Sequence, residues 1–127
     1  MEGEMLMPMR ILLAEDERTI SRLIKQVLSS AGHEVTGVQT CGEAIEKLRT
    51  DSFDLVLLDL NLADGDGFRV VEALQAHPRP ASHPPVVLMT GEHHFDDGDP
   101  RIQNVAGILW KPFELDELER AVNRFSA

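Results

Sequence analysis

The sequence predicts an α/β domain built on one doubly wound, five-stranded parallel sheet. Short apolar runs recur along the chain, and they alternate with segments whose apolar residues follow helical spacing. Wholly apolar runs of this length are typical of strands buried on both faces of a parallel sheet. Strict alternation of strand and helix implies right-handed crossovers, with helices on both faces. In addition, four of the runs end directly before reactive side chains, which are Glu15 with Asp16, Asp59, Thr90 and Lys111.

The first half of the chain predicts two strands and two helices. Residues 11–14 form the first apolar run, and a stripe of apolar residues over 20–31 predicts a helix that Gly32 is placed to end. Residues 33–39 mix valines with polar residues, which is typical of an edge strand. A short apolar stripe at 44–48 predicts the second helix.

The second half begins with the clearest strand, at residues 54–60. An apolar stripe at 70–74 predicts a third helix, and the proline-containing stretch 78–85 predicts a loop. The segment after Asp59 is likewise expected to be a loop. The remaining elements are expected to be strands at 85–90 and 107–111 and a last helix striped over 115–125.

A fourth helix is due between the last two strands, but the residues there oppose a long one. Gly91, Gly98 and Pro100 all disfavour helix interior positions. A short helix can begin late, with Asp99 as N-cap and Pro100 at the first helical position, and end near Val105. We therefore predict a truncated fourth helix.

Composition narrows the classes of function. The 127 residues fit one domain, which we place at 10–127, after a loose extension at 1–9. A net charge of −10 argues against nucleic-acid binding, because that function needs a basic surface. No run is long enough for a membrane span, and the start lacks the features of a signal peptide. Cys41 is the only cysteine, so we expect no internal disulfide and a cytoplasmic location.

The strand ends suggest phosphoryl chemistry. The carboxyl ends of parallel strands share one edge of a sheet, where ligands bind. Glu15, Asp16 and Asp59 would repel one another there, and Mg²⁺ would relieve the repulsion. A carboxylate can attack phosphorus to form an aspartyl phosphate, and Lys111 and Thr90 could neutralise the equatorial oxygens. The simpler alternative is that the acidic residues after the first strand only start a helix.

With these residues in place, the chain resembles the receiver domain of bacterial two-component response regulators over residues 10–126. The stretches that show the resemblance are residues 10–17 (RILLAEDE), 54–59 (DLVLLD) with Gly67 after them, 86–90 (VVLMT) and 111–113 (KPF). The resemblance implies a flavodoxin-like fold with strand order 2-1-3-4-5. It also implies phosphorylation by a sensor histidine kinase or a histidine phosphotransfer protein.

The resemblance also implies a role for each site residue. Asp59 would be the phosphoacceptor, and Thr90 and Lys111 would contact the phosphoryl group. The expected Mg²⁺ ligands are Glu15, Asp16, Asp59 and the backbone carbonyl of Asn61. The bond between Lys111 and Pro112 would be a cis peptide.

Two further pairs of positions concern the lifetime of the phosphoryl group and the way in which phosphorylation changes the surface. Asn61 and Glu92 match positions that tune phosphate lifetime in the family, and polar residues there imply fairly fast autodephosphorylation. Ile108 stands where most members have an aromatic switch residue. Trp110 follows two residues later and should share that strand face. The usual account of activation therefore does not transfer to this chain.

Other readings remain open. An aspartyl phosphatase would need an acid–base carboxylate where Asn61 stands, and the acidic residues after the first strand would repel a flavin phosphate. A receiver-like interaction module that works without phosphorylation is the main alternative. Because no output domain follows Ala127, we expect action through partner binding or phosphoryl relay rather than as a conventional enzyme. Cys41, at a helix start, is either a mildly activated thiol or a half-buried structural one.

Overall fold

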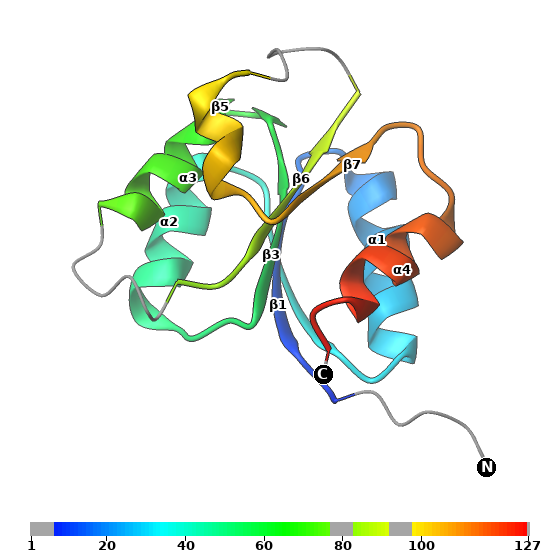
Figure 1. The fold of residues 1–127 in the computed structure, drawn as a ribbon. Helices are drawn as coiled ribbons and strands as arrows, with labels where there is room; N and C mark the ends of the chain where they lie inside the picture. Colours follow the sequence, from blue (N-terminus) through cyan, green and yellow to red (C-terminus); the bar gives the residue numbers. More distant parts are fainter. Residues whose placement is uncertain (1–6, 77–82, 92–97, 127) are drawn as a thin grey trace.

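The computed structural model describes residues 7–76, 83–91 and 98–126. Its main sheet has five parallel strands, and Figure 1 shows it nearly edge-on. Across the sheet the order is β2 (Glu34–Val38), β1 (Arg10–Ala14), β3 (Leu55–Asp59), β6 (Val86–Thr90) and β7 (Gly107–Trp110). Numbered within this sheet, the order is 2-1-3-4-5, which confirms the predicted fold class and topology.

Helices cover both faces of the sheet. Figure 1 shows α1 and α4 on one side, and α2 and α3 with the short helix η2 on the other. The helices are α1 (Arg18–Ser30), α2 (Cys41–Thr50), α3 (Phe68–Gln75), η2 (Pro100–Asn104) and α4 (Leu115–Asn123). None of the helices among the described residues is long and apolar enough to cross a membrane.

The two helical layers enclose two hydrophobic clusters, one on each face. Successive strand side chains point to opposite faces, so Leu12 joins the cluster under α2 and α3 while Leu13 joins the cluster under α1 and α4. Every residue of β3 is buried. Burial of each leucine contributes roughly 1.5–3 kcal/mol relative to leaving it exposed. The central strands are therefore packed on both faces up to their carboxyl ends, where the reactive residues lie.

Local capping explains where the helices begin and end. Glu17 caps α1 by accepting the Thr19 N–H, and Thr40 caps α2 through the Glu43 N–H. Gly32, with φ of 99°, follows the end of α1 in a conformation that favours glycine. The edge strand β2 is shorter than the predicted 33–39, with partly exposed side chains at its centre.

The shortened fourth helix is confirmed within the described residues. The segment Pro100–Asn104 is a 3₁₀-helix rather than an α-helix. Asp99 is its N-cap and accepts the Arg101 N–H, and Pro100 holds the first helical position, as predicted. Residues 92–97 lie outside the described residues, as do residues 77–82, which include the first part of the expected loop at 78–85.

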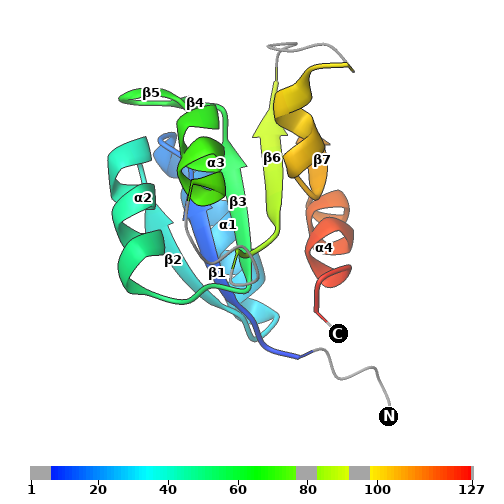
Figure 2. The ribbon, with the colours of Figure 1, turned by 60° about the vertical axis from the view of Figure 1, so that its left-hand side comes forward.

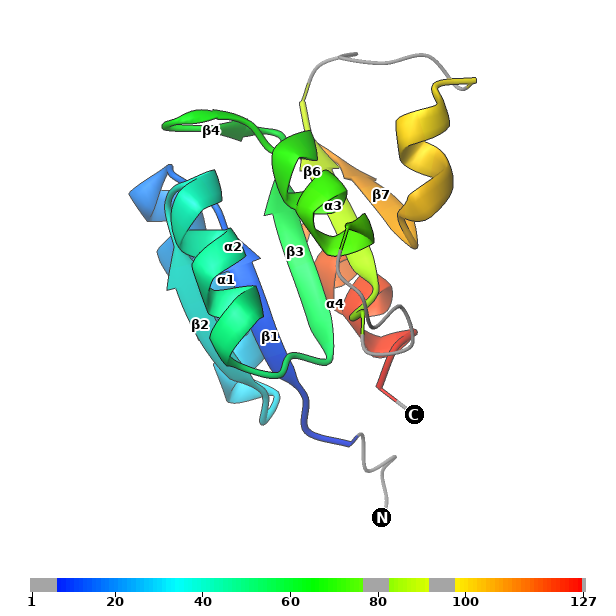
Figure 3. The same cartoon turned by 90° about the vertical axis from the view of Figure 1, so that its left-hand side faces the viewer.

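The segment after Asp59 is not a simple loop, and this expectation was wrong. Strands β4 (Asn61–Leu62) and β5 (Gly65–Asp66) pair antiparallel to form a small hairpin. Gly65 has φ of 142°, which a residue with a side chain rarely adopts. Figures 2 and 3 show this hairpin beyond the end of β3, next to the start of α3. It therefore borders the sheet edge where the reactive residues lie.

The two ends of the described chain lie together at the opposite end of the molecule (Figure 2). The Ser126 hydroxyl donates to the backbone carbonyl of Met7 at 2.5 Å. Met9 is buried, and its N–H donates to Nδ1 of His33 at 3.0 Å. Ordered packing thus begins before the first strand, inside the expected extension 1–9, of which residues 1–6 lie outside the described part.

Candidate functional site

The carboxyl ends of the central strands converge on one cleft. Glu15 directly follows β1, Asp59 ends β3, Thr90 ends β6, and Lys111 directly follows β7. All four side chains line a cleft of about 420 Å³. The other lining residues are Asp16, Glu17, Ile20, Asn61, Leu62 and Gly91. The structure thus brings together the residues that the strand ends predicted to meet.

Three carboxylates form the acidic side of this cleft. Glu15, Asp16 and Asp59 each offer an oxygen, and these oxygens lie within 4.8 Å of one another. Glu15 is 1% exposed and Asp59 is 4% exposed, whereas Asp16 is exposed to solvent. Because two of the three charges are buried, their mutual repulsion is only weakly screened by water. The cluster therefore favours a bound cation.

Asp59 is held on both of its carboxylate oxygens. Oδ1 accepts the backbone N–H of Asn61 at 2.9 Å, and Oδ2 accepts from Nζ of Lys111 at 2.9 Å. Gly67 packs directly against the backbone of this residue, where a Cβ would lie 2.4 Å from the Asp59 carbonyl oxygen. The N–H of Gly67 donates to the Leu60 carbonyl at 2.9 Å. This close approach fixes the start of the hairpin beside Asp59.

Lys111 joins two of the carboxylates. Its Nζ lies 2.8 Å from Oε1 of Glu15 and 2.9 Å from Oδ2 of Asp59. Its N–H donates to the Thr90 carbonyl at 2.8 Å, and the Lys111–Pro112 peptide bond is cis, as the resemblance implies. Burial lowers the pKa of Lys111, but the hydrogen bonds to Glu15 and Asp59 outweigh it, so the pKa lies above its ordinary value.

The pKa of Glu15 shows that the cleft disfavours a negative charge on this carboxyl. Burial raises the pKa of the Glu15 carboxyl above its usual value, and the nearby Asp59 carboxylate raises it further. Hydrogen bonds from Lys111 and from the Glu17 N–H, which lies 3.1 Å from Oε2, oppose that rise. Burial outweighs these stabilising contacts. A cation that binds here would therefore compete with a proton on Glu15.

The donor set fits a hard divalent cation. The ligand atoms that face the cleft are carboxylate oxygens, the type that Mg²⁺ prefers. The ammonium of Lys111 already bridges Glu15 and Asp59, which indicates that this position accepts positive charge. The open cleft leaves room, beside the three carboxylates, for the waters and phosphate oxygens that Mg²⁺ usually retains.

The remaining expected residues differ in where they lie. Thr90 is 1% exposed, and Asn61 lines the cleft from β4. Glu92 lies outside the described residues. Ile108 is half-buried and packs on the cluster under α2 and α3, whereas Trp110 is 42% exposed beside Thr90 in the strand register.

Sequence reasoning missed two apolar residues of the cleft, and the structure decides between the two readings of one thiol. Ile20 and Leu62 line the cleft, but an apolar residue in a helix or short strand gives no signal of its own. Cys41 is fully buried, and burial raises the pKa of its thiol to about 11, with nearby Asp64 adding to the effect. The activated-thiol reading is therefore wrong.

Comparison with known proteins points to the same family as the arrangement of the cleft residues. The family model for the response regulator receiver domain matches residues 11–123. The swarming motility regulation protein RssB of Serratia marcescens is 34% identical over 120 residues, a match that covers 91% of the chain and 53% of RssB. The chain thus spans about half the length of that relative.

Solved receiver structures have the same fold. The non-phosphorylated HemR receiver domain of Leptospira biflexa superposes with a TM-score of 0.81 at 30% identity, covering 94% of each chain. The receiver domain of sensor histidine kinase PA1611 from Pseudomonas aeruginosa PAO1 has a TM-score of 0.80 at 27% identity, covering 93% of this chain and 97% of that one. That structure has a magnesium ion coordinated in its active site cleft. The chain belongs to the response regulator receiver domain family.

Proposed function

We propose that this chain is the phosphoacceptor domain of a two-component or phosphorelay system, and that Asp59 accepts the phosphoryl group. The supporting observation is the position of its carboxylate. Asp59 is buried at a strand end, oriented by the Asn61 amide and the Lys111 ammonium, and faces an open cleft. A nucleophile held in this way has little orientational freedom to lose before it attacks.

The reaction joins Asp59 to phosphorus. A carboxylate oxygen of Asp59 attacks the phosphoryl group of a phosphohistidine, the new O–P bond forms, and the P–N bond breaks. The electron pair of the broken bond returns to the imidazole of the donor. Lys111 and the Thr90 hydroxyl stabilise the equatorial phosphoryl oxygens. The chain thus performs chemistry on its own side chain and is not a conventional enzyme.

The residues of the acidic cluster would hold Mg²⁺. Glu15, Asp16, Asp59 and the backbone carbonyl of Asn61 are the proposed ligands. When bound, the ion supplies positive charge that offsets repulsion between the carboxylates and the incoming phosphoryl oxygens. The magnesium in the PA1611 receiver domain supports this assignment.

Loss of the phosphoryl group would be assisted by Asn61 and Glu92. Their polar side chains would orient a water that attacks phosphorus, releases phosphate and restores the Asp59 carboxylate. Replacing Glu92 by leucine should therefore slow the decay of the phosphorylated protein. Decay at the parent rate or faster would contradict this role.

The donor would be a cytoplasmic sensor histidine kinase or a histidine phosphotransfer protein. Residues 10–127 would form the receiver domain, and phosphorylation would change the binding of a downstream protein or pass the group along a relay. Ile108 and Trp110 lie on β7, where Trp110 pairs with Thr90 and Ile108 with Leu88, and they are the proposed route to the surface. No nucleic acid or membrane is part of this proposal.

Mass spectrometry with a small phosphodonor tests the proposal. The protein is incubated with acetyl phosphate and Mg²⁺, and we expect a mass increase of one phosphoryl group that acid stabilises and alkali removes. Asp59→Asn should abolish the increase, and chelation of Mg²⁺ should suppress it. Asp116→Asn is the control, because it removes an exposed carboxylate that does not line the cleft.

The opposite result would identify the alternative function. If the folded parent takes up no phosphoryl group from a small donor or a kinase, the interaction module that works without phosphorylation is favoured. If Asp59→Asn is phosphorylated as readily as the parent, the assignment of Asp59 is wrong.

A further inference from the structure

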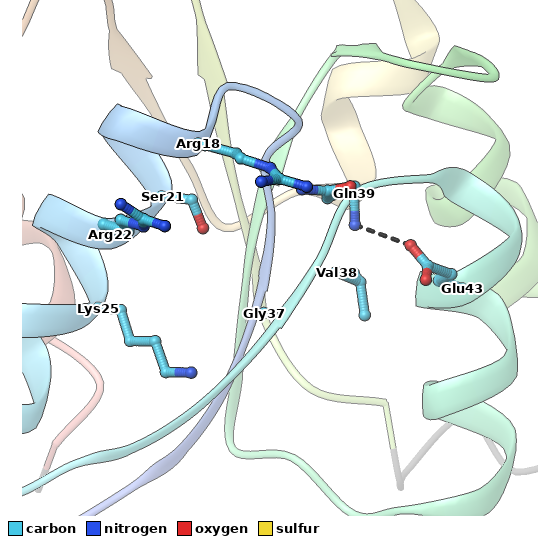
Figure 4. A pocket seen from close by; sticks show the side chains of 8 residues that line it. All are labelled: Arg18, Ser21, Arg22, Lys25, Gly37, Val38, Gln39 and Glu43. Carbon is cyan, nitrogen blue, oxygen red and sulfur yellow. Dashed lines mark hydrogen bonds between the residues drawn. The ribbon is translucent and has the colours of Figure 1, made fainter.

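A second hollow lies between α1 and the edge strand β2. It has a volume of about 340 Å³ and shares none of its lining residues with the acidic cleft. Figure 4 shows Arg18, Arg22 and Lys25 projecting from α1 on the side of β2. We call this hollow, with Ser21 and Gly37 between its walls, the basic groove.

The three cations of the basic groove form one stripe. They occupy positions i, i+4 and i+7 of α1, which lie on the same helix face. All three are exposed. Among the described residues, the ion pairs involve other cations, namely Arg10, Arg49, Arg69, Arg101, Lys111 and Arg120. The stripe therefore concentrates uncompensated positive charge on a chain whose net charge is −10.

The far wall of the groove contains one carboxylate, and it is already hydrogen-bonded elsewhere. Glu43 Oε1 accepts the Gln39 N–H at 3.0 Å (Figure 4). It also accepts the Thr40 hydroxyl at 3.3 Å. These contacts hold it at the start of α2 rather than against the cations. Glu43 thus leaves the charge of the stripe available to a partner.

The floor of the groove is open because of Gly37. A Cβ at this position would meet only Ser21 Oγ, at 3.8 Å, which is ordinary contact. β2 is the outermost strand, and Glu34 N–H and Val38 carbonyl bond toward β1. Alternate residues of a parallel strand bond to the same neighbour, so the backbone groups of Gly37 point away from the sheet. A bound chain could therefore reach them.

The length of the stripe discriminates between ligands. Seven residues of α-helix rise about 10 Å, so the three cations are spread along a line on the helix rather than gathered at one point. A peptide with several carboxylates along its length matches this spacing. A nucleic acid would also match the stripe, but its evenly charged backbone would continue past the groove onto the strongly acidic remainder of the chain, whereas a short acidic segment need cover only the groove.

We propose that the basic groove binds an acidic peptide segment of a partner protein, with its carboxylates paired to Arg18, Arg22 and Lys25. Positive charge on an otherwise acidic surface orients an approaching partner and fixes the register of binding. This contact lies outside the residues proposed for phosphoryl transfer, so it can be tested without affecting that chemistry.

Binding of a fluorescein-labelled deca-glutamate peptide tests the proposal. Fluorescence anisotropy should show binding at low salt that weakens as salt rises, because exposed ion pairs are screened. The double variant Arg22→Gln/Lys25→Gln should weaken binding by roughly fivefold to tenfold. Lys47→Gln/Arg49→Gln on α2 makes the same change in net charge at exposed positions and should bind like the parent.

Two more measurements distinguish binding in the groove from a general attraction to positive charge. Gly37→Val fills the floor without changing any charge and should also weaken peptide binding, while its thermal stability shows that it folds. In amide NMR spectra, the peptide should shift the signals of Ser21, Lys25 and Gly37. Phosphorylation of Asp59 by acetyl phosphate should be unchanged in the double variant.

Other results would overturn the proposal. Equal peptide binding by the parent and the double variant would do so, as would equal weakening in the Lys47→Gln/Arg49→Gln control. Tighter binding of a single-stranded oligonucleotide than of the peptide would identify a nucleic acid instead. Self-association that the double variant abolishes would identify a second copy as the occupant.

Discussion

Two hollows flank the start of α1, and their charged side chains differ in burial and in pairing. In the acidic cleft, Glu15 and Asp59 are almost fully buried and both bond to the same ammonium. In the basic groove, Arg22 and Lys25 are exposed and belong to none of the ion pairs among the described residues. The first arrangement orients groups for chemistry, whereas the second leaves charge free for recognition.

The contrast has an energetic basis. Buried charges interact strongly, and each must be neutralised by a fixed partner or by a proton. Exposed charges interact weakly with one another and contribute little to folding, but their field reaches an approaching molecule. Substitutions in the cleft should therefore change stability, and substitutions in the groove should change binding.

The largest effect on stability is expected from Lys111→Met. Removing the ammonium leaves Glu15 and Asp59 facing each other without a cation, at a cost of about 3 kcal/mol in the free energy of unfolding. Urea denaturation without Mg²⁺ measures this cost. Adding Mg²⁺ should restore more stability to the variant than to the parent. Unchanged stability in the absence of metal would show that the two carboxylates do not depend on Lys111.

Gly67→Ala should produce the next largest loss, about 2 kcal/mol. The new Cβ would lie 2.4 Å from the Asp59 carbonyl oxygen, so the backbone beside the phosphoacceptor candidate must move. Chemical denaturation measures the loss, and phosphorylation by acetyl phosphate should also slow. Gly98→Ala is a suitable control, because nothing lies within 4 Å of a Cβ there.

The pH dependence of stability should reveal Glu15, with a smaller effect. Its pKa is raised by burial, so between its ordinary value of 4.5 and the raised value the folded protein keeps a proton that the unfolded chain has lost. Stability therefore falls as the pH rises through that window. In Glu15→Gln this part of the decline should disappear. An identical pH profile in the two proteins, measured without metal, would contradict the raised pKa.

The smallest effect on stability is expected from Arg22→Gln/Lys25→Gln. Since these exposed side chains form no ion pair within the described residues, the free energy of unfolding should change by less than about 0.5 kcal/mol. Thermal denaturation measures this change. A loss comparable to that of Lys111→Met would show that the groove is a structural element and would remove the contrast between the two hollows.

The sequence predicted the parts of the fold whose signal is periodic or continuous. β3 was clear because its apolar run is unbroken, and the short fourth helix followed from Asp99 and Pro100. The hairpin after β3 was missed because strands of two residues have no detectable period.

The two hollows also differ in how clearly the sequence indicates them. The residues of the acidic cleft could be predicted to meet, because each follows a strand whose end must lie at the shared sheet edge. The basic groove could not, because Arg18, Arg22 and Lys25 look like any solvated helix face. Only the position of β2 beside α1 shows that they border a hollow.

The buried Cys41 has a practical consequence for all these measurements. With its side chain inaccessible and its thiol pKa near 11, it should resist alkylation at neutral pH while the protein is folded. The chain contains no other cysteine. A cysteine introduced at an exposed position such as Gln26 could therefore be coupled selectively to a dye or spin label. The natural sequence thus already provides the background needed for site-specific spectroscopy.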